Sequence, residues 1–203
     1  DVCSSDLCQR PSTTQAGGDT PRRTFRALER LTELARVRRS PAVARTRLLN
    51  WLTFNVLTGN SDAHLKNLSF LVGPAGIQLA PHYDMLSVAV YDSRAFGKPG
   101  WPEHTTLAWP ILDATRFSQI DRGLILQAAR GLGINRSTAD RLLAQQRDRI
   151  VTTAEALYRQ FDNDASRRLQ ARPELGPTMA GESRCLRAII HTVIKEMVVR
   201  LSE

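Results

Sequence analysis

The pattern of hydrophobic and polar positions predicts a protein built mainly from α-helices. After a possible cap at Asp19 or Thr20, apolar residues recur at helical spacing and predict a first helix: Phe25, Leu28, Leu31 and Ala35. A second helix is expected to begin at Pro41. It is apolar on almost every side up to Leu57, which indicates burial, and Gly59 is its natural C-cap.

One β-hairpin is expected next, because residues 68–72 and 77–79 are short apolar runs separated by a Gly-Pro-Ala-Gly turn. Both runs are expected to be buried. Residues 92–110 contain several glycines and prolines and indicate an irregular excursion. The hairpin is therefore the only β-structure predicted, and it follows the buried helix directly.

Three further helices complete the prediction. Ser118 with Asp121 has the spacing of a capping box for a helix that ends near Gly131, and Ser137 with Asp140 has the same spacing for a long helix reaching about Leu169. Two prolines and a glycine then interrupt the chain before a last amphipathic helix, which carries Leu186, Ile189, Ile190, Val193, Met197 and Leu201. The expected fold class is mainly α with one small β-hairpin.

Composition is compatible with one cytoplasmic domain. The chain has 203 residues, of which 42% are hydrophobic, enough for one sizeable core. It contains no apolar run of about eighteen residues and no signal-peptide pattern, so no membrane association is expected. Its three cysteines have no disulfide or metal-binding spacing. We expect a loop at residues 8–20 and a single lobe at residues 21–203.

The first seven residues are unusual. They read DVCSSDL, which is the translation of a common sequencing-library adapter, and no initiator methionine precedes them. We expect residues 1–7 to be an artefact of a reading frame cut at its 5′ end, with the true protein beginning near Cys8.

The net charge of +8 raises the possibility of a basic nucleic-acid-binding module. Only three of the 28 basic residues are lysine, a bias that a GC-rich genome also produces. The densest basic stretch, residues 22–47, interleaves apolar residues at helical spacing, which favours a solvated helix face. No helix-turn-helix, zinc-finger or RNP motif supports the nucleic-acid alternative.

The chemistry is concentrated in the polar segment between the buried helix and the hairpin. Asp62 and Asn67 are separated by four residues, the D-x-x-x-x-N spacing of a kinase catalytic loop. In that chemistry a carboxylate accepts the proton of the attacking hydroxyl, and a nearby amide oxygen binds Mg²⁺. Asp84 follows the hairpin, which is expected to return it to the side of Asn67 as a second oxygen ligand.

Two other interpretations stay open for these residues. Each residue alone is also typical of a turn or a helix cap. In addition, Asp62 with His64 and His82 with Asp84 form mirrored D-x-H and H-x-D pairs, which a Zn²⁺-dependent or two-metal hydrolase could use. That alternative leaves Asn67 without a role.

Three stretches resemble the HipA family of serine/threonine kinases: WLTFNVLTGNSDAHLKNLS at 51–69, LAPHYDMLS at 79–87 and TLAWPILDATRFSQIDR at 106–122. The resemblance implies a helical C-terminal kinase lobe. It also implies that Asp62 is the catalytic base and that Asn67 and Asp84 bind Mg²⁺ and, through it, the nucleotide. Lys66 would neutralise charge on the transferring phosphoryl group, and His64 would pack to hold the loop.

The family also implies partners. ATP would be the phosphate donor, and a protein would be the acceptor, aminoacyl-tRNA synthetases being one class associated with the family. A HipB-like helix-turn-helix antitoxin would be the binding partner, so that DNA is contacted mainly through it and not directly. The chain contains no glycine-rich phosphate loop and no strand lysine for ATP. We therefore expect a fragment without its N-terminal, ATP-gripping lobe, inactive alone.

Overall fold

The structure, a computed structural model, describes residues 40–74 and 76–203. The helices are α2 (Pro41–Leu57), α3 (Arg122–Gly131), α4 (Arg136–Ala171), α5 (Gly176–Ala188) and α6 (Lys195–Arg200). The strands form two antiparallel hairpins, β1 (Phe70–Gly73) with β2 (Gly76–Leu79), and β3 (Thr106–Ile111) with β4 (Ala114–Arg116). The mainly α fold class is confirmed. The expected artefact at 1–7, the loop at 8–20 and the helix after Pro21 lie outside the described residues.

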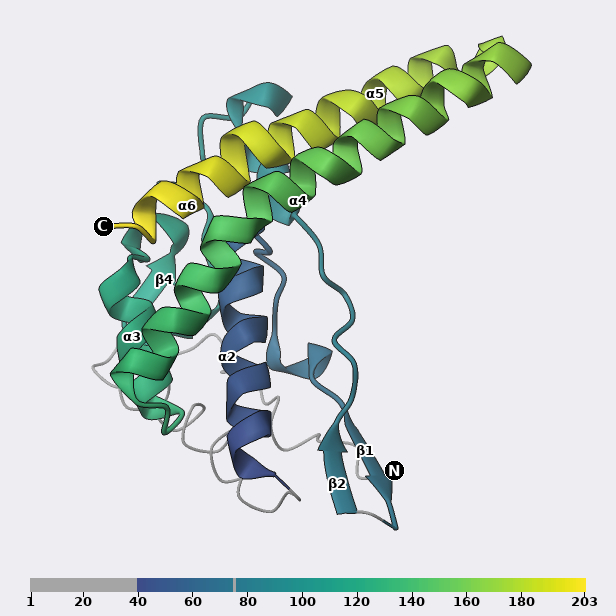
Figure 1. Cartoon of the computed structure of the whole chain (residues 1–203). Helices are drawn as coiled ribbons and strands as arrows, with labels where there is room; N and C mark the ends of the chain where they lie inside the picture. Colours follow the sequence, from purple (N-terminus) through teal and green to yellow (C-terminus); the bar gives the residue numbers. More distant parts are fainter. Residues whose placement is uncertain (1–39, 75) are drawn as a thin grey trace, which may run out of the picture.

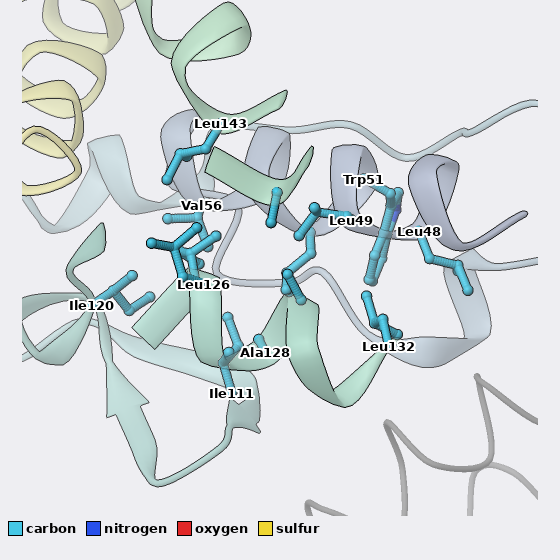
Figure 2. Close-up of a cluster of buried hydrophobic side chains, with 14 of the residues drawn as sticks. Leu48, Leu49, Trp51, Val56, Ile111, Ile120, Leu126, Ala128, Leu132 and Leu143 are labelled. Carbon is cyan, nitrogen blue, oxygen red and sulfur yellow. The ribbon is translucent and has the colours of Figure 1, made fainter. Parts of the chain in front are cut away.

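Helix α2 lies at the centre of the molecule, as its apolar sequence predicts. Pro41 occupies its first turn, where a missing N–H costs nothing. Its buried positions cover nearly the whole circumference and include Leu48, Leu49, Trp51, Leu52, Val56 and Leu57. Figure 2 shows Leu48, Leu49, Trp51 and Val56 in one cluster with Leu126 and Ala128 of α3 and with Ile111 and Ile120 from the region before it. The core therefore surrounds the helix that leads into the candidate catalytic loop.

The helices begin at residues other than the predicted capping boxes. Asp121 itself caps α3 by accepting from the Leu124 N–H at 2.7 Å. Ser118 belongs instead to a short 3-10 helix, η5 (Phe117–Gln119). Helix α4 is capped by Asn135, which accepts from the Thr138 N–H at 2.9 Å. Asp140 does not form the predicted capping box. Its side chain instead pairs with that of Arg122 at 2.7 Å and joins α4 to α3.

The second hairpin corrects the prediction of an irregular excursion over residues 92–110. Pro110 is tolerated in β3 because a two-stranded hairpin leaves one side of each strand unpaired, and the pairing with β4 is interrupted between Thr106 and Ile111. The two-residue turn contains Leu112 at φ 54°, a conformation that costs a leucine energy. Leu112 is nonetheless buried, so packing of its side chain offsets that cost.

The first hairpin differs from the prediction in its burial. Residues 71 and 72 expose 58% and 74% of their surface, so this hairpin projects from the body and is not buried. Leu68 and Leu79, at its base, are buried and attach it to the core. Arg47 of α2 strengthens the attachment by donating to the carbonyl oxygens of Leu79 at 2.8 Å and Ala80 at 3.0 Å.

The C-terminal helices form a long arm. Figure 1 shows α4 and α5 running side by side away from the body, antiparallel to each other. The chain then returns through a π-helical segment, η7 (Ile189–Ile194), into α6 without a break. Trp101 donates to the carbonyl oxygen of Thr192 within this segment at 3.3 Å. In the part of the chain that the structure describes, no helix is both long and apolar enough to cross a membrane.

Candidate active site

The candidate loop begins at a tightly closed helix end. The N–H of Gly59 donates to the Val56 carbonyl at 3.1 Å, and that of Asn60 donates to the Asn55 carbonyl at 2.8 Å. This pair of bonds is the Schellman motif, which requires a left-handed residue at the position of Gly59. Gly59 has φ 64°, as the predicted C-cap role demands. The motif reverses the chain within two residues and sets the direction in which the loop leaves α2.

Asn60 is the residue that organises the loop, and it is 3% exposed. Its side-chain nitrogen donates to the Asn55 side-chain oxygen at 2.7 Å and to the Asp84 carbonyl at 3.0 Å. Its side-chain oxygen accepts from the Asp62 N–H at 3.2 Å. Asn55 is fixed in turn, because its amide donates to the Trp51 carbonyl at 2.8 Å. One buried amide thus connects the helix, the loop and the segment after the hairpin.

Asn67 lies at the end of a short 3-10 helix, η2 (Leu65–Asn67), and is buried. Its backbone N–H donates to the His64 carbonyl at 3.0 Å. Its side-chain nitrogen donates to the Asp62 carbonyl at 3.5 Å, which leaves its side-chain oxygen as the group able to face a cation. The side chain of Asp62 is exposed. The structure therefore brings the backbone of Asp62 and the amide of Asn67 together.

Asp84 is exposed and adopts φ 57°, in the left-handed region that an aspartate tolerates better than most residues. Strain of this kind persists where surrounding contacts fix the backbone, and functional sites concentrate it. Here the fixing contact is the bond from Asn60. Next to it, the Tyr83 hydroxyl donates to the Lys66 carbonyl at 2.7 Å and lies 2.9 Å from the Ser69 hydroxyl. These contacts bring the segment of Asp84 beside the loop; a common Mg²⁺ site with Asn67 stays a prediction.

The remaining predicted residues flank this network. The Lys66 side chain is exposed beside Asn67. His64 is half-buried, and its Nδ1 atom is buried without a hydrogen-bond partner among the described residues. His82 lies near Arg47. Burial lowers the pKa of His82, and the positive charge of Arg47 lowers it further, although a hydrogen bond from the ring to the Arg47 backbone opposes the shift. Folding therefore shifts His82 toward its neutral form.

The mirrored Asp and His pairs do not assemble as the hydrolase alternative requires. Within residues 40–74 and 76–203, no three His, Cys, Asp or Glu side chains gather in a way that could hold a metal ion. The kinase interpretation instead uses Asn67 and Asp84, whose side chains would offer hard oxygen atoms. Such oxygens suit Mg²⁺ better than Zn²⁺.

The sequence interpretation included Asn60 in the loop without assigning it a role. A signal was present: Asn55 and Asn60 are amides five positions apart, one in the last turns of a largely apolar helix and the other just after it. Buried amides need partners, because an unsatisfied buried polar group costs about 1–3 kcal/mol. Two such residues so close together favour a mutual hydrogen bond, which the structure contains.

Replacing Asn60 with Ala is expected to destabilise the loop and its support together. The change leaves the Asn55 side-chain oxygen, the Asp62 N–H and the Asp84 carbonyl without a partner, so the free energy of unfolding should fall by roughly 2–4 kcal/mol. Urea unfolding measures it. Ser69→Ala is the matched control, because it removes one exposed hydrogen bond and should cost less than about 1 kcal/mol. Equal stability of the two variants would contradict the role given to Asn60.

Comparison with known proteins identifies the family of the chain. The family model of the HipA-like C-terminal domain matches residues 5–168. The serine/threonine-protein kinase toxin HipA of Shewanella oneidensis is 46% identical over 66 residues, which are 32% of this chain and 15% of that protein. Y4mE of Sinorhizobium fredii, named as a candidate kinase, is 40% identical over 90 residues, which are 42% of this chain and 20% of that protein.

A solved structure shares the fold. It is the complex of HipA, HipB and operator DNA from Shewanella oneidensis, whose matching chain has a TM-score of 0.55 and 28% identity. The match covers 85% of this chain and 37% of the other, so this chain corresponds to a minor part of its relatives' length. Because the family model spans most of the chain, including the loop from Gly59 to Asn67 and Asp84, the chain belongs to the HipA-like C-terminal domain family.

Proposed function

We propose that this chain is the part of a protein serine/threonine kinase that carries the catalytic base and the metal ligands. The reaction would transfer the γ-phosphate of ATP to a protein hydroxyl. The observation that carries the proposal is the bonding of Asn60, whose one buried side chain contacts the backbones of both Asp62 and Asp84. Such a support holds reactive groups in a fixed relation, which transfer reactions require.

Asp62 would act as the base. Its carboxylate is exposed at the tip of the loop, whereas its backbone is held by Asn60 on one side and by Asn67 on the other. A carboxylate presented in this way is able to orient the acceptor hydroxyl and take its proton.

Asn67 and Asp84 would hold Mg²⁺. The orientation of the Asn67 amide and the exposed Asp84 carboxylate fit this role, because both present oxygen atoms beside the same loop. Bound Mg²⁺ supplies neutralisation of the phosphate charge. Lys66, exposed between Asp62 and Asn67, would add positive charge near the transferring group, and His64 would support the loop by packing.

The phosphate-covering loop and the ATP-binding lysine would come from a segment that precedes this chain in the complete protein. The sequence has neither motif, and the matched region is 15% to 20% of the curated relatives' lengths. We further propose a HipB-like helix-turn-helix antitoxin as partner, by analogy with the HipA, HipB and operator DNA complex. The protein substrate of the kinase would be of the class associated with the family, such as an aminoacyl-tRNA synthetase.

Transfer from radiolabelled ATP tests the proposal. A complete protein that joins this chain to the proposed ATP-binding segment should phosphorylate itself or a protein substrate in a Mg²⁺-dependent reaction. The 203-residue chain alone should remain near background, because positioning of the nucleotide supplies about 7–11 kcal/mol of barrier lowering. Transfer by the isolated chain at the rate of the complete protein would contradict the proposal that a separate segment supplies the ATP-binding groups. A complete protein that binds ATP but transfers nothing would contradict the kinase function.

A further inference from the structure

A basic groove lies on the arm, along α5 and η7. We name it the α5 groove; it is lined by Ala95 of η4 (Arg94–Phe96) and, along α5 and η7, by Ala180, Arg184, Arg187, Ala188 and His191. Its volume is about 460 Å³. The three alanines keep the groove open, and the three basic side chains are spaced three to four residues apart, which places them on one face of the helix.

The arginine charges of the α5 groove have no counter-ion in the described part of the chain. Among the residues that the structure describes, neither Arg184 nor Arg187 forms an ion pair, and no carboxylate lines the groove. Some arginines of the body do form ion pairs, as Arg122 does with Asp140 and Arg200 does with Glu196, whereas Arg184 and Arg187 share one hollow without one. Two arginines converging on one hollow without a carboxylate repel each other unless an anion lies between them.

One of the arginines is already oriented. The Arg184 guanidinium lies over the Phe96 ring, 5.2 Å from its centroid, and Phe96 is held edge-on by Tyr91 at 5.0 Å. A cation–π contact fixes a long side chain at little cost, so less entropy is lost when a ligand binds. The Ser183 hydroxyl at the edge of the groove is 2.9 Å from the Tyr158 hydroxyl, which ties this wall to α4.

We propose that the α5 groove binds a phosphate monoester, either a phosphorylated side chain or a small phosphorylated molecule. Two guanidinium forks offer more donors than a carboxylate has oxygens to accept, and they match the several oxygens of a phosphate. A duplex presents its phosphates in a row along a convex surface, whereas these basic groups line one concave hollow. The groove lies mostly beyond residue 168, where the match to the family model ends, so the proposal rests on the residues of this chain and not on that match.

Calorimetric titration of the 203-residue chain at low salt tests the proposal. The probes are inorganic phosphate, a short peptide with one phosphoserine, the same peptide with glutamate in its place, and a short DNA duplex. We expect the phosphoserine peptide and inorganic phosphate to bind, and the glutamate peptide to bind at least about tenfold more weakly. A phosphopeptide that binds more tightly than inorganic phosphate would indicate a protein ligand, and equal binding would indicate a small molecule.

Matched variants locate the binding. Arg184→Gln with Arg187→Gln should weaken phosphate binding about tenfold or more, whereas Arg141→Gln with Arg149→Gln removes the same charge from exposed positions of α4 and should leave it unchanged. Arg187→Gln alone should also weaken it, and because Arg187 makes no ion pair this variant should fold normally. The proposal would be overturned if both double variants lost phosphate affinity equally or if phosphate did not bind. It would also be overturned if the duplex bound more tightly than the phosphopeptide.

Discussion

Replacing Asp62 with Asn in the complete protein should lower phosphoryl transfer by about 10²–10⁴-fold, the usual contribution of a general base. The substitution keeps the size of the side chain and removes its negative charge. It should also leave the fold intact, because the backbone of Asp62, not its carboxylate, makes the contacts with Asn60 and Asn67. Nucleotide binding should therefore be kept while the chemical step is lost.

Asp84→Asn extends this test to the metal site. It should lower transfer and also raise the Mg²⁺ concentration needed for half-maximal rate, since a charged ligand is replaced by a neutral one. Asp113→Asn is the control, because Asp113 is an exposed aspartate in the turn of the second hairpin. Full transfer by a folded Asp62→Asn protein, or an unchanged Mg²⁺ requirement in Asp84→Asn, would show that this loop is not the kinase centre.

Gly59→Ala should be the most destabilising single substitution of a glycine in the described chain, at roughly 3–5 kcal/mol. Two causes add. A left-handed conformation costs an alanine about 1–2 kcal/mol. The new methyl group would also lie 2.5 Å from Cγ1 of Val193 and 3.0 Å from Cβ of Ala89, closer than packed atoms allow. Because small domains are stable by only about 5–15 kcal/mol, the loop and its helix should be lost together.

Gly97→Ala separates the two causes. Gly97 has φ 78°, also left-handed, but a methyl group there would meet nothing within 4 Å. It should therefore cost only the conformational part, about 1–2 kcal/mol. Urea unfolding of both variants measures the difference, which reports the steric overlap with Val193 and Ala89. If Gly59→Ala lowers the free energy of unfolding no more than Gly97→Ala does, the end of α2 moves enough to remove the steric overlap, and the prediction is wrong.

The mainly helical fold and the position of the candidate site could be predicted because they depend on local patterns. The apolar circumference of α2 predicts burial, and Gly59 predicts where the helix ends, so the loop had to start there. The spacing of Asp62 and Asn67 then fixes their relation within a short segment. The return of Asp84 followed from the hairpin alone.

Other features could not be predicted because distant packing decides them. Asn60 acquires its role only when Asp84, 24 residues away, lies beside it. Ser118 and Asp140 each belong to a predicted capping box, yet neither caps a helix. Asp121 caps α3, Asn135 caps α4, and Asp140 instead pairs with Arg122. Leu112 adopts a backbone conformation usually left to glycine or asparagine, because the core accepts its side chain.

The π-helical segment η7 makes the position of helix α6 sensitive to the deletion of a single residue. A wide turn of this kind accommodates one residue more than an α-helix would, so the helix beyond it is offset by about 100° around its axis relative to an uninterrupted α-helix. That offset lets Met197 and Leu201 reach the core while α5 keeps its own face toward α4. The segment therefore contains one extra residue without interrupting the helical run from α5 to α6. Loss of one residue there would restore α-helical hydrogen bonding and turn Met197 and Leu201 away from α2.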